Sequence, residues 1–246
     1  MKAKPYLKEI SFKRNDVADF EQYPFTIAAV RNLDVLAFHP DVTFLVGENG
    51  TGKSTLVEAI ALLMGFSSEG GTRNVRFSTA ETVSELHKYL KPVKSYKRPE
   101  DHYFLRAESF FNVATYMDQL GFLDGGYGEG KSLHQRSHGE AFMALLTHKL
   151  RGRGFYIFDE PEAALSPTRQ LAALSAIHHL VEDESQFIIA THSPILLAYP
   201  RSKILLLNES GITEVKYEET EHYSVTRYFL NHHPKMIDAL LKKTTD

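Results

Sequence analysis

The segment VTFLVGENGTGKST, residues 42–55, constrains the fold of this chain more than any other stretch. Its apolar start, Val42–Val46, predicts a buried strand. The residues that follow match the phosphate-binding pattern G-x-x-x-x-G-K-[ST], the Walker A motif, with fixed positions at Gly47, Gly52, Lys53 and Ser54. A helix is predicted from Leu56 onward, and its positive N-terminal end would face a bound phosphate. A strand, a glycine-rich loop and a helix in this order predict a nucleoside triphosphate site.

The same loop predicts which residues contact the nucleotide. Backbone N–H groups can wrap a β-phosphate only where side chains leave room, which is why glycines recur in the loop. Lys53 can reach the β- and γ-phosphate oxygens, and the Ser54 hydroxyl can bind Mg²⁺. The candidate nucleotide-binding residues of the loop are Gly47, Asn49, Gly50, Thr51, Gly52, Lys53, Ser54 and Thr55.

A second motif supplies acidic side chains for the same chemistry. The apolar run Phe155–Phe158 predicts a buried strand that ends in Asp159 and Glu160, a Walker B pattern. Asp159 is placed to hold Mg²⁺, mostly through water, and Glu160 to orient or deprotonate an attacking water. His192 follows the next predicted strand, so it should reach the same sheet edge and sense the γ-phosphate. Glu160 and His192 are therefore the predicted catalytic residues.

Composition excludes several classes of protein. The net charge of −3 gives no global basic field for nucleic acid, and the absence of cysteine excludes disulfides and thiolate metal sites. Cysteine-free chains fit a reducing compartment, so we expect a cytoplasmic protein. The longest apolar run, at Ala59–Met64, is far shorter than the roughly 20 residues that span a bilayer, so no direct membrane insertion is expected.

Strand-like and helix-like stretches alternate along the chain, which predicts an α/β fold with a mainly parallel, doubly wound sheet and helices on both faces. An N-terminal antiparallel β layer is expected from Tyr6–Phe12 and Phe25–Val30, with Val35–Phe38 as a candidate third strand. We expect one domain over residues 1–246, in which 1–80 and 151–246 form the nucleotide-binding core. Residues from about 81 to 150 would form a small helical subdomain.

The other predicted strands are Tyr103–Ala107, Phe187–Ala190, Lys203–Leu207 and Ile212–Tyr217. The predicted helices are Leu56–Met64, Glu81–Leu90, Ser109–Leu120, Ala141–Leu150, Ser166–Val181, His222–Leu230 and Lys235–Lys243. Glycine-rich loops are expected at Gly65–Thr79, which carries Arg73 and Arg76, and at Gly121–Lys131.

Two features each allow two interpretations. Phe20 or Tyr23 could stack on an adenine base, although ordinary packing is the commoner role of such rings. The segment Lys88–Arg98 is rich in lysine and arginine and could contact nucleic acid, although a solvated loop is the commoner case.

Taken in order, these motifs resemble the ATP-binding-cassette (ABC) class of P-loop ATPases over nearly the whole chain. GENGTGKST matches the phosphate loop, FYIFDEPEAAL the Walker B segment and THSP the switch histidine. RSHGE resembles a variant of the signature motif of the class. Transporter members almost always carry LSGGQ there, whereas His138 and Glu140 replace its first glycine and final glutamine. The chain looks closest to the SMC-type and recombination-repair ATPases and their small stand-alone, AAA/ABC-like relatives.

The resemblance implies a head-to-tail homodimer with two ATP–Mg²⁺ between the subunits. Lys53 and Ser54 of one chain would hold each ATP together with the signature residues of the other chain, Ser137, Gly139 and Glu140. In such proteins ATP closes the dimer and hydrolysis removes the contact that held it shut, which makes the dimer a switch.

The chain departs from the family pattern at three places. The family's glutamine after the middle strand is absent, and Glu108, or in another alignment Arg106, stands there, so Glu108 joins Ser54 and Asp159 as a predicted metal ligand. The loop after Walker B lacks the usual aspartate at Leu165-Ser166-Pro167. The stretch from Glu108 to Ser137 is short for the helical subdomain of a transporter.

We therefore expect an ATPase that converts ATP to ADP and phosphate and whose ATP-dependent dimerisation acts on DNA or on a nuclease or toxin-type protein. The alternative is the ATPase subunit of an ABC transporter, which the variant signature and the short subdomain disfavour. A non-enzymatic nucleotide-binding module would have no use for Glu160 and His192. A small-metabolite kinase would leave the signature segment, Ser137–Glu140, unexplained.

Overall fold

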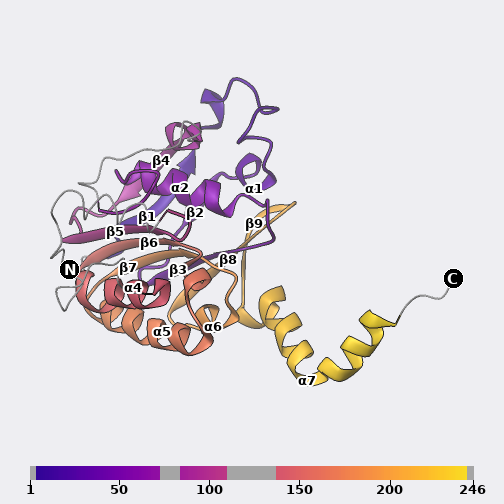
Figure 1. The fold of residues 1–246 in the computed structure, drawn as a ribbon. Coiled ribbons are helices and arrows are strands. Elements are labelled where there is room, and N and C mark those ends of the chain that lie inside the picture. Colours follow the sequence, from indigo (N-terminus) through magenta and orange to yellow (C-terminus); the bar gives the residue numbers. More distant parts are fainter. Residues whose placement is uncertain (1–3, 73–83, 110–136, 243–246) are drawn as a thin grey trace.

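A six-stranded sheet lies at the centre of the molecule (Figure 1). The computed structural model describes residues 4–72, 84–109 and 137–242. The strand order is β5-β6-β7-β3-β8-β9, in which the first five strands are parallel and β9 is antiparallel to β8. These strands are β3 Val42–Val46, β5 Asp101–Arg106, β6 Gly154–Asp159, β7 Gln186–Ala190, β8 Ser202–Asn208 and β9 Gly211–Val215. The predicted mainly parallel sheet is confirmed, with small shifts at the strand ends.

A second, smaller sheet contains three antiparallel strands in the order β2-β1-β4. They are β1 Leu7–Phe12, β2 Val35–Ala37 and β4 Leu90–Lys94. The predicted N-terminal antiparallel layer is thus confirmed, with the strands near Tyr6–Phe12 and Val35–Phe38 in it.

The strand predicted at Phe25–Val30 is wrong. The amide of Phe25 donates to the carbonyl of Gln22 (2.8 Å), so the chain turns here. The short helix α1, Ala28–Arg31, then follows. The ring of Phe25 packs edge-on against Tyr89, with centroids 4.9 Å apart. The apolar residues of this segment pack under the small sheet and do not pair as a strand. A short apolar run in the sequence cannot distinguish these two roles.

The solvated loop favoured for Lys88–Arg98 is wrong in its centre, because Leu90–Lys94 forms β4. Pro92 lies opposite Ile10 in the register with β1. Because β4 is an edge strand, a residue without an N–H can stand there without losing a ladder hydrogen bond.

The two faces of the large sheet are covered by different elements, because successive side chains of a strand point to opposite faces. Leu45, Ile157 and Ile188 belong to the core that includes α2 and the small sheet. Their neighbours Phe44, Phe158 and Ile189 belong to the core beneath α4, α5 and α6. These helices are α2 Lys53–Leu63, α4 His138–Ala144, α5 Pro167–Glu182 and α6 Pro194–Leu197. Helices on both faces are therefore confirmed (Figure 1).

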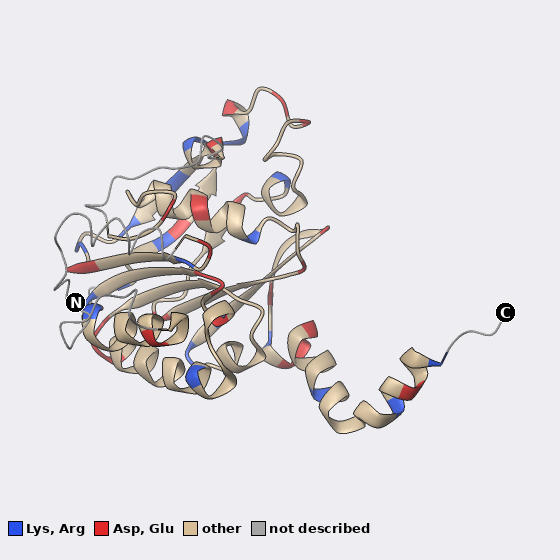
Figure 2. Ribbon diagram, viewed as in Figure 1, with Lys and Arg blue, Asp and Glu red and all other residues tan. Residues whose placement is uncertain are grey.

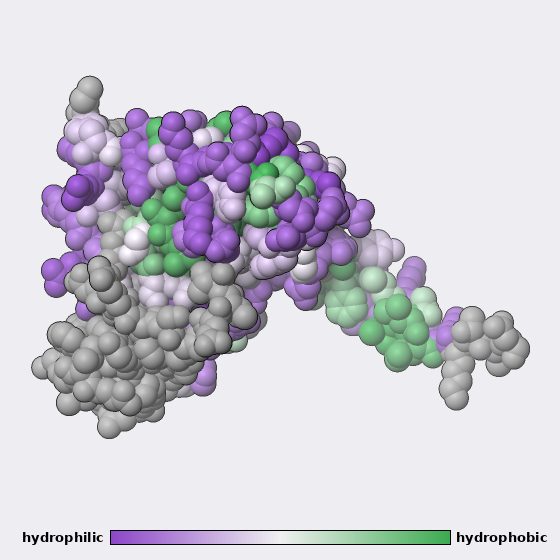
Figure 3. Space-filling view, turned by 90° about the horizontal axis from the view of Figure 1, so that it is seen from above, coloured by the Kyte–Doolittle hydropathy of each residue, from purple (hydrophilic) through white to green (hydrophobic). Residues whose placement is uncertain are grey.

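The last helix, α7 Glu221–Leu241, projects from the rest of the molecule as an arm (Figure 1), and none of its residues is buried. Its backbone leaves helical geometry at His232, two residues before Pro234, so the two predicted C-terminal helices form one kinked helix. Large apolar side chains are exposed along the arm, at Val225, Tyr228, Phe229, Leu230, Ile237, Leu240 and Leu241. Figure 3 shows this apolar colouring on the projecting arm.

Several predictions fall on residues that the structure does not describe. These are the helix expected from Ser109 to Leu120 beyond its first residue, the loop Gly121–Lys131, and Arg73 and Arg76. In place of the helix predicted at Glu81–Leu90, the described part forms a 3₁₀ turn, Glu85–Tyr89. Within the described ranges, no helix has both the length and the apolar character to cross a membrane.

One buried side chain, Gln186, joins the two sheets. Its Oε1 accepts from the amide of Leu7 (3.0 Å), and its Nε2 donates to the carbonyls of Leu7 (2.9 Å) and His39 (3.0 Å). Gln186 opens β7 of the large sheet, and Leu7 opens β1 of the small one. Because buried polar groups left without partners are costly, these hydrogen bonds fix how the two sheets meet.

We expect Gln186→Leu to lower the free energy of unfolding by about 3 kcal/mol, because it leaves three buried or partly buried backbone groups without their hydrogen-bond partner. Urea unfolding followed by circular dichroism measures the change. Gln22→Leu makes the same chemical change at an exposed position and should stay within about 0.5 kcal/mol. Equal effects of the two substitutions would contradict a linking role for Gln186.

Candidate nucleotide-binding site

The phosphate loop joins β3 to α2, and close packing explains its glycines. A Cβ at Gly47 would lie 2.3 Å from the carbonyl oxygen of Leu207 in β8. A Cβ at Gly52 would lie 2.7 Å from Cγ2 of Ile27, and both glycines have positive φ values. A side chain at Gly47 would need the backbone to move, whereas one at Gly52 would displace the Ile27 side chain and be strained by the φ of 95°. The loop therefore follows this path most readily with glycine at both positions.

Lys53 opens α2 and folds back over the phosphate loop. Its Nζ donates to the carbonyls of Gly47 (2.7 Å) and Glu48 (2.9 Å), which are loop backbone groups. Burial lowers the pKa of Lys53, while the carboxylates of Glu160 and Asp159 oppose that shift. A cation held against the loop in this way can exchange its carbonyl partners for phosphate oxygens.

The edge of the sheet brings the two motifs together. Asp159 ends β6 and lies level with Ala190, the last residue of β7, in the strand register. Its Oδ1 accepts from the Ser54 hydroxyl at 3.3 Å, across from the start of α2. Burial raises the pKa of Asp159 to about 6, against the lowering effect of Arg106. A hydroxyl and a carboxylate that converge here are oxygen donors of the kind that Mg²⁺ prefers, so the residues fit that ion.

Glu160 and His192 face each other beside this carboxylate. Glu160 has a left-handed backbone (φ 53°), unusual for a residue other than glycine, and its amide donates to the carbonyl of Ala190 (3.0 Å). Its Oε1 lies 3.8 Å from Nε2 of His192. That nitrogen is buried and makes no hydrogen bond with any residue in the described part of the chain. The structure thus places both predicted catalytic side chains at one edge, with a strained backbone at the first.

The sequence reasoning missed Glu162, which ties the Walker B segment to the loop after β7. Its carboxylate accepts from the Thr191 hydroxyl (2.7 Å) and from the backbone amide of His192 (2.5 Å). Burial raises the pKa of Glu162, and these two hydrogen bonds oppose the shift. A second acidic residue so soon after Glu160 was a signal that could have suggested a structural role.

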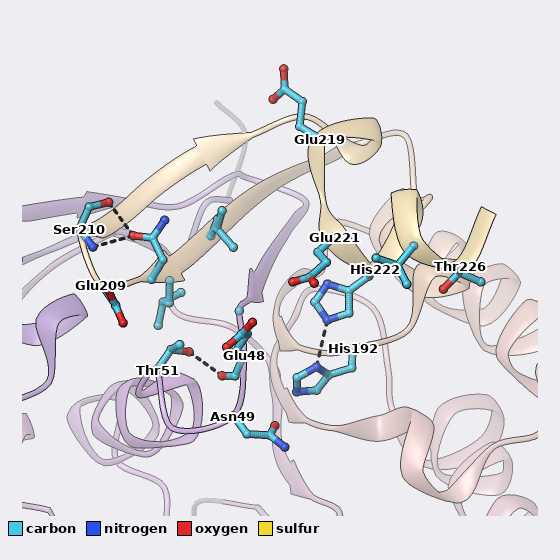
Figure 4. Close-up of a pocket in the computed structure, with 15 residues that line it drawn as sticks. Glu48, Asn49, Thr51, His192, Glu209, Ser210, Glu219, Glu221, His222 and Thr226 are labelled. Atoms are coloured by element: carbon cyan, nitrogen blue, oxygen red, sulfur yellow. Dashed lines mark hydrogen bonds between the residues drawn. The ribbon is translucent and has the colours of Figure 1, made fainter. Parts of the chain in front are cut away.

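His222, in the first turn of α7, was also missed. Its Nε2 lies 3.0 Å from Nδ1 of His192, and Figure 4 shows the two rings pointing toward each other. Beside them is a cavity of about 1090 Å³. It is bounded by the outer side of the phosphate loop, the β8–β9 turn and the start of α7 (Figure 4). No local pattern pairs two histidines so far apart in sequence.

At the place of the missing glutamine, the structure puts Arg106 next to Asp159. The Nη1 of Arg106 pairs with Glu58 (2.9 Å), and its Nε lies 3.8 Å from Oδ2 of Asp159. Glu108 has an 85% exposed side chain, whose carboxylate lies 3.8 Å from the same Nε. Both residues flank the Asp159 carboxylate, and the metal role of Glu108 stays a prediction.

Of the two candidate aromatic residues, only Tyr23 lies against the loop. Its hydroxyl shares a hydrogen bond with the Thr55 hydroxyl (3.1 Å), and 64% of the residue is exposed. Phe20 instead packs edge-on against Phe12 and Phe25 in the small-sheet core. The packing interpretation therefore holds for Phe20, whereas the Tyr23 ring remains available to a ligand.

The signature segment forms the start of α4. Ser137 and Glu140 cap this helix reciprocally, and the guanidinium of Arg169 in α5 reaches both, at 3.2 Å and 3.3 Å. Gly139 is buried, and a Cβ there would lie 2.7 Å from the carbonyl of Ala164, so packing demands a glycine. Among the described residues, no hydrogen bond or ion pair links this segment to the phosphate loop of the same chain.

The lysines of Lys88–Arg98 lie on and beside β4, as the blue segments of Figure 2 show. Lys88 forms an ion pair with Glu85, and Nζ of Lys94 donates to the carbonyl of Leu63 (3.2 Å). Part of this basic cluster is therefore engaged within the chain itself.

Comparison with known proteins agrees with this geometry. A family model described as "AAA domain" matches residues 19–114, and one described as "AAA domain, putative AbiEii toxin, Type IV TA system" matches residues 83–198. The ribose import ATP-binding protein of Chelativorans sp. is 29% identical over 205 residues. That alignment covers 76% of this chain but only 39% of the relative, so the chain spans well under half of that protein.

Two further comparisons cover most of the protein to which this chain is similar. An uncharacterized ABC transporter ATP-binding protein of Methanocaldococcus jannaschii is 24% identical, over 76% of this chain and 90% of that protein. The SMC head domain from Thermotoga maritima is 16% identical in sequence, with a TM-score of 0.43 over 88% of this chain and 99% of that one.

The two AAA models overlap and together run from residue 19, between β1 and β2, to residue 198, directly after α6. They cover the phosphate loop, the Asp159 edge and His192, which are the parts whose geometry is described above. Over these residues the chain is similar to P-loop ATPase domains of the AAA and ABC types.

Proposed function

We propose that this protein binds ATP with Mg²⁺, hydrolyses it in the cytoplasm, and works as a homodimeric switch on a macromolecular partner. The observation that carries the proposal is the convergence of Lys53, Ser54, Asp159, Glu160 and His192 at the carboxyl edge of three parallel strands. Only a triphosphate with a cation and an attacking water requires all of these groups at one place.

Each of these side chains has a role that its position supports. Lys53 would bind β- and γ-phosphate oxygens beside the loop amides, and Ser54 with Asp159 would hold Mg²⁺. When bound, Mg²⁺ neutralises charge on the β- and γ-phosphates. Glu160 would accept a proton from the attacking water or orient it, and His192 would contact the γ-phosphate from the opposite side of that carboxylate.

A two-chain site accounts for the signature segment. Ser137 and Glu140 are exposed and held in place by Arg169, and in the described part of the chain no hydrogen bond or ion pair joins them to their own phosphate loop. A rigid polar turn of this kind is suited to contact the nucleotide of a second copy in a head-to-tail dimer. Gly139 would then contribute by allowing the turn to pack tightly against Ala164.

A protein partner fits the surface better than DNA. The net charge is −3, and two lysines of the basic cluster are paired within the chain. The arm α7 exposes a run of large apolar side chains, which is typical of protein-contacting surfaces. One matching family model names a toxin of a toxin–antitoxin system, so a toxin-type effector is one form of this function. The alternative, a transporter ATPase subunit, rests on the names of two relatives, a ribose import ATP-binding protein and an ABC transporter ATP-binding protein.

Two substitutions separate ATP binding from ATP turnover. Lys53→Ala should abolish ATP binding, because it removes the phosphate-binding cation. Glu160→Gln should keep ATP binding, slow hydrolysis at least about 100-fold, and elute as an ATP-bound dimer in gel filtration. Isothermal titration and phosphate release measure the two effects. A Glu160→Gln protein that stays monomeric with saturating ATP–Mg²⁺ would be incompatible with the two-chain site.

A mixing experiment tests the shared site directly. Lys53→Ala and Ser137→Arg should each be inactive alone. The first variant has a phosphate loop that cannot bind ATP, and the second has a disrupted signature segment. Mixed in equal amounts, they form mixed dimers with one intact composite site, and about a quarter of the wild-type ATPase rate should return. The control mixture, Lys53→Ala with Glu160→Gln, damages the same half of the site twice and should stay inactive. No recovery in the first mixture would argue against sharing.

A binding assay separates the two classes of partner. We expect DNA affinity, measured by fluorescence anisotropy with the Glu160→Gln protein at two salt concentrations, to be unchanged by ATP. A DNA-binding switch would instead gain affinity with ATP and lose it steeply with salt. ATP-dependent, salt-sensitive binding would therefore identify DNA, and not a protein, as the partner.

A further inference from the structure

The contact between His192 and His222 links the nucleotide edge to the arm. Nδ1 of His192 and Nε2 of His222 are 3.0 Å apart, and the two rings are inclined at 52°. His222 lies in the first turn of α7, which Thr220 caps by accepting from the amide of Tyr223 (3.3 Å). Tyr217 holds the preceding turn by donating to the carbonyl of Pro194 (2.8 Å). The His222 ring is thus presented to His192 by a fixed helix start (Figure 4).

A hydrogen bond between two neutral imidazoles needs one nitrogen that donates and one that accepts, so the tautomers of the two rings are coupled. A neutral ring carries one N–H, so if Nδ1 of His192 accepts from His222, the proton of His192 must be on Nε2. That Nε2 is the atom that faces Glu160 at 3.8 Å and has no hydrogen-bond partner among the described residues. With its proton on Nε2, His192 can donate to a γ-phosphate oxygen. The other tautomer could only accept there, and phosphate offers no donor.

The charges around the pair favour two neutral rings. Burial lowers the pKa of both histidines, and the ammonium of Lys53 lowers both further. Glu160 acts in the opposite direction on His192, and Glu221 and Glu162 do so on His222.

We propose that His222 is a positioning residue that holds His192 as its Nε2–H tautomer and points that proton at the γ-phosphate. The proposal rests on the nucleotide site proposed above. It adds His222, at the start of the arm, to the residues of that site.

The same bond makes the arm sensitive to the nucleotide. No residue of α7 is buried, so its attachment depends on contacts near its start. If His192 moves toward a γ-phosphate, its bond to His222 changes, and the start of the arm must follow or lose a contact. By the same coupling, a partner that holds the arm in one position favours one position of the His192 ring.

The test compares His222→Ala with His222→Gln, whose side-chain amide can still donate to Nδ1 of His192. Protein labelled with ¹⁵N-histidine reports the His192 tautomer in long-range ¹H–¹⁵N spectra, and His192→Gln identifies its signals among the 12 histidines. We expect Nε2–H in the wild type and in His222→Gln, and a mixture of tautomers in His222→Ala. The matched control, His233→Ala, changes an exposed histidine beyond the kink and should leave the His192 signals unchanged.

Steady-state ATPase rates supply the second readout. His222→Ala should lower kcat about 10-fold with little change in KM, and His222→Gln should recover most of the loss. An Nδ1–H tautomer of His192 in the wild type, or unchanged His192 signals in His222→Ala, would overturn the proposal. The tautomer is measured without turnover, so a wild-type protein with no ATPase activity would refute the proposed function while the spectra still decide the role of His222.

Discussion

The parallel register of β3, β6 and β7 is the constraint on which the rest of the structure depends. Leu45 of β3 lies level with Ala190 of β7, and Ala190 lies level with Asp159 of β6. Because the three strands end together, the phosphate loop, the acidic pair and the switch histidine emerge at one edge, although they are far apart in the sequence. Buried strands with apolar side chains on both faces hold this register, since a slip would carry each side chain to the wrong core.

The site contains groups whose burial or backbone conformation is unfavourable for the stability of the fold. Burial raises the pKa of Asp159 to about 6 and also raises that of Glu162, so both carboxylates are held where their charge is unfavourable. Glu160 stands in a left-handed backbone conformation beside them. Lys53 and Arg106 supply the opposing charge, and hydrogen bonds from Thr191 and His192 hold Glu162. Such concentration of strain and buried charge is characteristic of functional sites, where ligands restore the balance.

Beyond the shared apolar core, single polar side chains link the elements around this edge. Glu162 joins the Walker B turn to the loop after β7, Arg169 joins α5 to the signature segment, and His222 joins the arm to His192. Each link uses a polar group of fixed geometry, so a shift at one end alters a specific hydrogen bond at the other. This arrangement suits a protein whose nucleotide state must be felt at surfaces away from the nucleotide.

The sequence by itself determined the phosphate loop, the Walker B strand and the alternation of strands and helices, because each depends on residues that are adjacent in the chain. It also placed Lys53, Ser54, Asp159, Glu160 and His192 at one edge, since parallel strands share their carboxyl ends. Only the tertiary structure decided that Phe25 packs in a turn while Leu90–Lys94 forms a strand, and that Tyr23 rather than Phe20 meets the loop. It alone brought Gln186 to Leu7 and His222 to His192. The reason is physical: a pattern of neighbours records local backbone preference, whereas these pairings depend on how distant segments pack.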